Sequence, residues 1–99
     1  MSRPKNYWFF TAKKMCLRYP HLKNYNGLQE VLWYNAIVKT LQQTEELPNG
    51  PERLIVIQKV LFDKTDTVIG MSQKLAYCER VLWQWVNDFI NTVGKNAGF

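Results

Sequence analysis

Apolar side chains recur at three- and four-residue steps from Leu28 to Glu45, and this spacing is the clearest structural signal in the sequence. It predicts an amphipathic helix, because residues three and four apart share one face of an α-helix. The residues expected on its buried face are Leu28, Val31, Leu32, Tyr34, Ile37, Val38 and Leu41. No two alternating apolar and polar runs are joined by a tight turn, so hairpin signals are poor. We therefore expect an all-α protein.

Two further segments on either side of this helix carry helical patterns. We expect the segment Tyr7 to Arg18 to end at Tyr19-Pro20, because the residue before a proline avoids the α region. Its expected apolar contacts are Tyr7, Phe10, Met15 and Leu17. The segment Glu52 to Phe62 follows Pro51, which suits the first turn of a helix. Its inward residues should be Leu54, Ile55, Ile57, Val60, Leu61 and Phe62, which would make this helix central.

The chain has 99 residues, of which 46% are hydrophobic, and this is enough for one domain with a modest core. We expect a small helical domain of four to five helices, with supporting helices and a basic arm in 1–50 and a helix-turn-helix region in 51–99. No apolar run approaches the ~20 residues of a membrane-spanning helix. The N-terminal stretch also lacks the apolar core of a signal peptide. We therefore expect a cytoplasmic protein that does not enter a membrane.

Positive charge is concentrated at the N-terminal end of this chain, whose net charge is +5. Residues 1–29 hold six basic side chains and no acidic one, whereas residues 30–99 hold seven basic and eight acidic side chains. The six are Arg3, Lys5, Lys13, Lys14, Arg18 and Lys23. A basic arm on a near-neutral body suits a phosphate backbone or an anionic membrane surface. A basic face that merely keeps the protein soluble is the alternative.

The C-terminal third has the pattern of a helix-turn-helix. A short helical segment, Val68 to Leu75, is separated by 76–78 from a long one, Glu79 to Asn96. Where two such helices cross, the first needs a small residue, and Ser72 stands there. Four residues later the turn needs a residue that tolerates a tight or left-handed backbone, and Ala76 occupies that place although glycine is more usual. The expected apolar anchors are Met71, Leu75, Tyr77, Leu82 and Trp85.

This pattern predicts which side chains of the second helix face outward, where a DNA-binding helix-turn-helix enters the major groove. They are Glu79, Arg80, Trp83, Gln84 and Asn87. Arg80 and Gln84 lie one turn apart, and these residue types pair with guanine and adenine respectively. Lys13, Lys14 and Arg18 could meet phosphates, which would position the protein without giving specificity.

Each candidate also has an ordinary structural explanation. Arg80 and Gln84 could be solvated helix residues. Glu79 could stabilise the N-terminus of the helix through the helix dipole rather than contact a base. Trp83 could touch a thymine methyl group or a sugar, pack on a protein partner, or pack in the core. Arg3 and Lys5 could form an arm in the minor groove or a solvated tail.

No catalytic or metal-binding pattern accompanies these residues. There is no glycine-rich phosphate loop, no paired-histidine metal motif and no serine nucleophile elbow. Cys16 and Cys78 do not form a Cys-x-x-Cys pair, and only His21 could join them as a ligand. We therefore expect free thiols rather than a zinc site, no cofactor and no enzymatic activity.

One family resemblance covers about residues 54 to 99. It lies in the run Leu61 to Gly70, its continuation Met71 to Arg80, and the stretch from Trp83 through Ile90 to Gly98. These segments resemble the helix-turn-helix of phage late-transcription activators of the RinA/ArpU type, which look like region four of bacterial sigma factors. Cys78 departs from that family's usual Ser or Thr cap. The resemblance implies promoter binding, contact with host RNA polymerase, and a place in the bacterial cytoplasm.

From these observations we expect a sequence-specific DNA-binding regulator of phage or prophage origin, which activates late genes by positioning RNA polymerase. Two other classes stay open. One is a DNA-packaging protein like a small terminase subunit, which would assemble into a ring. The other is a helical adaptor that binds a protein partner through its aromatic surface. The sequence leaves open whether the protein is a monomer or a homodimer.

Overall fold

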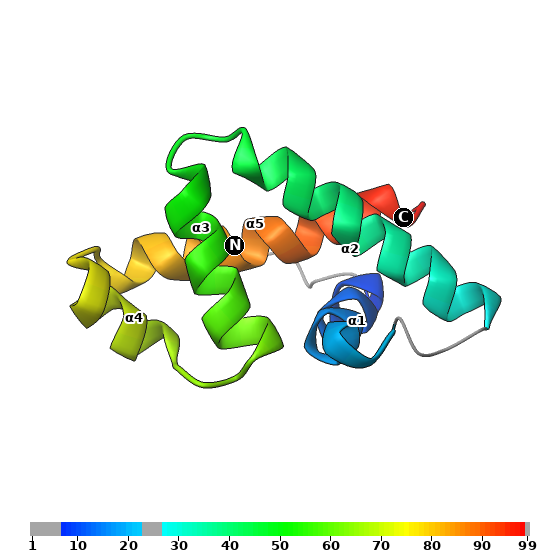
Figure 1. Ribbon diagram of the computed structural model, residues 1–99, viewed down its shortest axis with the longest axis horizontal. Coiled ribbons are helices and arrows are strands. Elements are labelled where there is room, and N and C mark those ends of the chain that lie inside the picture. Colours follow the sequence, from blue (N-terminus) through cyan, green and yellow to red (C-terminus); the bar gives the residue numbers. More distant parts are fainter. Residues whose placement is uncertain (1–6, 23–26, 99) are drawn as a thin grey trace.

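The computed structural model describes residues 7–22 and 27–98, which fold into helices with no strand in those ranges. The helices are α1 (Tyr7–Leu22), α2 (Leu28–Glu45), α3 (Gly50–Ile57), its π-helical continuation η1 (Gln58–Phe62), α4 (Val68–Leu75) and α5 (Glu79–Asn96). The all-α prediction is confirmed. Helix α5 is the central element, since it packs against α1, α2, α3 and α4 (Figure 1). The segment 52–62 was expected in that role.

Helix α2 has the predicted bounds, but its buried face differs from the prediction. Trp33, Ile37 and Thr40 are buried, as are Ala36 and Thr44. The hydroxyl of Thr40 donates to the carbonyl of Ala36 at 2.7 Å, and Thr44 donates to Thr40 in the same way. Because each hydroxyl is satisfied within the helix, a threonine can occupy the core.

The first turns of α2 carry apolar side chains that the core does not cover. Leu28 is 90% exposed, and Val31 and Leu32 are exposed as well. The prediction that these three residues are buried is wrong. They also recur at three- and four-residue steps, but their stripe lies across the helix from Trp33 and Ile37, on which the core is built.

Helix α1 runs four residues beyond its predicted end and contains Pro20 in its last turn. The expected stop at Tyr19-Pro20 is wrong: the helix includes Pro20 and ends two residues later, and it forgoes the one bond that an N–H at position 20 would donate to the carbonyl of Cys16. The ammonium of Lys64 caps this end by donating to the carbonyl of Leu17 at 2.8 Å. Helix α1 buries Phe9, Ala12 and Cys16, whereas Phe10, an expected contact, is 61% exposed.

Helix α3 begins at Gly50, where the chain turns back sharply from α2. A Cβ at this position would lie 2.2 Å from the carbonyl oxygen of Glu45, so the close approach requires glycine. Pro51 stands in the first turn, as predicted. Ile57 is buried in the expected direction, but Ile55 is exposed, which corrects its predicted inward position.

Candidate nucleic-acid interface

The turn between α4 and α5 has the backbone conformation that the sequence pattern requires. Helix α4 starts at a capping residue, Thr67, whose hydroxyl accepts a hydrogen bond from the backbone N–H of Gly70 at 3.0 Å. Ala76 ends the helix in the left-handed region with φ 60° and ψ 34°. The prediction of a left-handed residue at this place is confirmed. Cys78 is the residue before α5 and makes no side-chain cap there.

The predicted anchors hold α4 and α5 to the rest of the core. Met71, Leu82 and Trp85 are buried, and Leu75 and Tyr77 are partly buried against the same cluster. Ser72 is half-buried and turns its hydroxyl to the carbonyl of Ile69 at 2.7 Å. Burial of these anchors fixes the inner side of α5 and leaves its outer side to solvent.

A polar and aromatic clamp fixes the same turn to α3. The hydroxyl of Tyr77 donates to Oε2 of Glu52 at 2.8 Å, and its ring packs edge-on to Trp85 with centroids 5.0 Å apart. The guanidinium of Arg53 also lies against Trp85, 5.4 Å from its ring centroid. Its Nε donates to the carbonyl of Pro48 at 2.9 Å. The sequence reasoning missed Glu52 and Arg53, because no local pattern marks residues that act across 25 or more positions.

The outer side of the first two turns of α5 is open. Glu79, Arg80 and Gln84 are exposed, and Trp83 is 46% exposed although it is a large aromatic residue. Asn87, one turn further on, is half-buried. All five residues expected on this side therefore reach solvent to some degree. We call this set, Glu79, Arg80, Trp83, Gln84 and Asn87, the outer face of α5.

Within the outer face, two side chains are hydrogen-bonded to each other, and the other three make no side-chain hydrogen bond in the described ranges. The indole N–H of Trp83 donates to Oε1 of Glu79 at 3.2 Å. Arg80 and Gln84 make no hydrogen bond or ion pair with any residue in the described ranges. In the described ranges Lys74 of α4 forms an ion pair with Asp66 at 2.6 Å, and the hydrogen bond from this lysine lowers the pKa of the Asp66 carboxyl. Arg80 therefore remains an uncompensated, exposed cation.

The basic residues of α1 lie elsewhere on the molecule. Lys13 and Lys14 are exposed, and Arg18 is half-buried. Figure 1 places α4 at one end of α5 and α1 beside the middle of α5, so the two groups of candidates do not form one compact cluster. The remaining bases of the predicted arm, Arg3, Lys5 and Lys23, lie outside the described residues.

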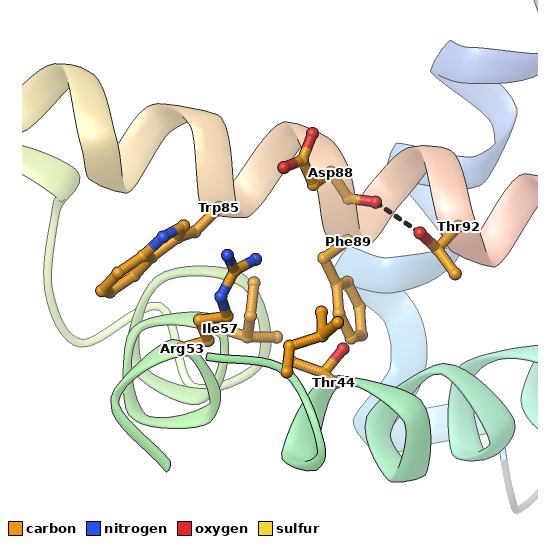
Figure 2. Close-up of a pocket in the computed structure, with 8 residues that line it drawn as sticks. Thr44, Arg53, Ile57, Trp85, Asp88, Phe89 and Thr92 are labelled. Carbon is orange, nitrogen blue, oxygen red and sulfur yellow. Dashed lines mark hydrogen bonds between the residues drawn. The ribbon is translucent and has the colours of Figure 1, made fainter. Parts of the chain in front are cut away.

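One cavity on the inner side of α5 is too small to hold an organic ligand. It encloses about 20 Å³ between α2, α3 and α5, and Arg53, Trp85 and Phe89 are among the residues that line it (Figure 2). Ligand pockets are usually more than tenfold larger, in the range of roughly 300–1,000 Å³. Asp88 also lines this cavity, its carboxylate points away from Arg53 (Figure 2), and its backbone carbonyl accepts from the hydroxyl of Thr92 at 2.8 Å.

In the part of the chain that the structure describes, no group of three or more His, Cys, Asp or Glu side chains is placed to hold a metal ion. None of the helices in 7–22 and 27–98 is both long enough and apolar enough to cross a bilayer. Comparisons of the chain with protein-family models, with curated proteins and with solved structures find no match.

Proposed function

We propose that the protein is a sequence-specific transcriptional regulator that binds double-stranded DNA through the outer face of α5. The observation that carries this proposal is the pair Arg80 and Gln84, which are exposed, lie one turn apart and have no partner in the described residues. An arginine pairs with O6 and N7 of guanine, and a glutamine pairs with N6 and N7 of adenine. Two such side chains on one exposed helix face suit the major groove.

The surroundings of α5 support this assignment. In a DNA-binding helix-turn-helix, the second helix must be held firmly from behind while its N-terminal half stays free to enter the groove. Here the left-handed turn at Ala76, the buried anchors and the Tyr77–Glu52 bond hold α5 from behind. Lys13 and Lys14 are exposed and serve in this proposal as phosphate contacts that orient the protein on the duplex.

The regulatory part of the proposal draws on the resemblance to phage late-transcription activators. The protein would bind a late promoter and position host RNA polymerase there, without catalysing a reaction. No side chain in the outer face of α5 needs a cofactor or a metal ion for this role, since hydrogen bonds and phosphate contacts supply the binding.

Binding to duplex DNA at several salt concentrations tests the proposal. We expect binding at about 50 mM salt and a linear fall of log affinity with log salt, since phosphate contacts release counterions. Arg80→Ala should weaken binding to the preferred duplex by about 5- to 150-fold, which corresponds to the ~1–3 kcal/mol of one base contact. Lys95→Ala is the matched control, because Lys95 is an exposed cation at the other end of α5. Equal loss in both variants, or no binding at about 50 mM salt, contradicts the proposal.

A second candidate function is a helical adaptor for a protein partner. The observation that favours it is the exposed apolar strip of Leu28, Val31 and Leu32 on α2, because monomeric proteins seldom leave such side chains clustered in the open. An adaptor would bind its partner through this strip and show no salt-sensitive affinity for DNA. The variant Leu32→Asp would then abolish partner binding, while Arg80→Ala would leave it unchanged.

A further inference from the structure

Trp83 is the one large aromatic side chain on the outer face of α5, and its polar atom is already used. An indole has a single hydrogen-bonding group, the Nε1–H donor. In Trp83 this donor is bonded to Glu79 one turn earlier, at 3.2 Å. The 46% of the side chain that remains exposed therefore offers carbon surface rather than a hydrogen bond.

The same bond fixes where this apolar surface lies. Long side chains of a helix lean toward its N-terminus, and the contact with Glu79 holds the indole over the first turn of α5. In the proposed mode of binding, this is the end of α5 that goes deepest into the groove. Arg80 stands three residues before Trp83, and Gln84 directly follows it. An apolar plate is thus placed beside two side chains that read bases by hydrogen bonds.

The floor of the major groove offers one apolar feature to such a plate. The base edges there otherwise present hydrogen-bond donors and acceptors, whereas thymine adds the methyl group on C5. Methylation of cytosine at C5 places the same group in the same groove. The hydrogen-bonding groups of Arg80 and Gln84 gain nothing from that methyl, whereas the apolar face of an indole whose donor is already satisfied can pack on it.

We propose that Trp83 reads the C5 methyl group of a pyrimidine in the bound duplex, with thymine as the natural case. This inference rests on the proposed function, and it adds that the preferred sequence holds a methylated pyrimidine next to the bases read by Arg80 and Gln84. Glu79 acts here as a positioning residue that keeps the indole over the first turn and does not itself contact a base.

The test replaces each thymine of the preferred duplex, one at a time, with deoxyuridine, which lacks only that methyl group. At one or two pyrimidine positions we expect the affinity of the parent protein to fall about fourfold, which is ~0.8 kcal/mol for one buried methyl group. Trp83→Ala should bind the thymine and uracil duplexes equally well. Ile69→Ala is the matched control, because Ile69 is an exposed apolar residue on α4, and it should keep the fourfold preference.

The role of Glu79 has its own readout. Glu79→Gln keeps an oxygen that accepts from the indole, so the preference for thymine over uracil should survive, whereas Glu79→Ala should reduce it. Circular dichroism establishes that each variant is folded, and Trp83→Phe provides a smaller aromatic ring if Trp83→Ala is unstable. The inference is overturned if no thymine-to-uracil replacement changes affinity while Arg80→Ala still weakens binding, an outcome that leaves the proposed function intact. Absence of any DNA binding overturns both.

Discussion

The hydroxyl of Tyr77 donates a 2.8 Å hydrogen bond to Oε2 of Glu52, and this bond joins the turn before α5 to the first turn of α3. Because the carboxylate accepts from the protonated phenol, the bond raises the pKa of Tyr77 above its usual 10.0, and burial adds to the effect. Burial and the neighbouring Tyr34 likewise raise the pKa of Tyr19.

These shifts predict a loss of stability in alkali. A group whose pKa is raised by folding stabilises the fold below its unfolded pKa, and that contribution disappears as the pH rises through the folded pKa. The free energy of unfolding should therefore fall above about pH 10. Urea unfolding at pH 8 and pH 11 measures this fall, which should be smaller in Tyr77→Phe and in Glu52→Gln than in the parent. An unchanged fall in both variants would contradict the role assigned to the bond.

The orientation of α2 gives a prediction about stability. Ile37 is fully buried and Leu28 is 90% exposed, although both belong to the same three- and four-residue pattern. Ile37→Ala should lower the free energy of unfolding by about 2–5 kcal/mol, because it leaves a cavity in the core. Leu28→Ala should change it by less than about 0.5 kcal/mol. Urea denaturation of the two variants measures the difference, and equal losses would place Leu28 in the core after all.

The left-handed backbone of Ala76 predicts that one substitution stabilises the protein. A residue with a Cβ is strained at φ 60°, whereas glycine is not. Ala76→Gly should raise the free energy of unfolding by up to about 1 kcal/mol. The same change at Ala36, a buried position inside α2, should lower it by about 1 kcal/mol or more. A loss of stability in Ala76→Gly would show that the turn adopts another conformation.

The two thiols should differ in reactivity. Burial raises the pKa of Cys16 to about 12, so its reactive thiolate is rare near neutral pH, while Cys78 is exposed before α5. A thiol reagent at pH 8 should titrate one cysteine in the native protein and two after unfolding in guanidinium chloride. Cys78→Ser should leave the native protein unreactive. Rapid reaction of both thiols in the native parent would contradict the burial of Cys16.

The helices could be predicted from the sequence wherever turn-forming residues and apolar spacing mark their ends. The bounds of α2, α4 and α5 match the prediction, and so does the left-handed place at Ala76, because breaks, turns and spacing are local properties. Pro20 misled the prediction for α1, because a proline removes one helical hydrogen bond and strains the preceding turn but does not always end the helix.

The buried faces and the clamp were harder to predict. Leu28 and Ile37 are both apolar but lie nine residues apart, on opposite sides of the helix, and only the packing of α1 and α5 against α2 decides which side is covered. Thr40 has a polar hydroxyl, and its burial depends on a bond to the carbonyl of Ala36. The Glu52–Tyr77 contact joins residues far apart in sequence, so it follows from the fold rather than from a motif.

Selection of bound fragments from random duplex DNA tests the central claim most directly. Separate selections are made with the parent protein, with Arg80→Ala and with Gln84→Ala. Lys95→Ala is the control, because it removes a cation from the same helix. We expect the parent and Lys95→Ala to enrich one common motif, and the other two variants each to lose preference at a different base pair of it. If all four proteins enrich the same motif with the same affinity, or if none enriches any motif, the outer face of α5 does not read DNA.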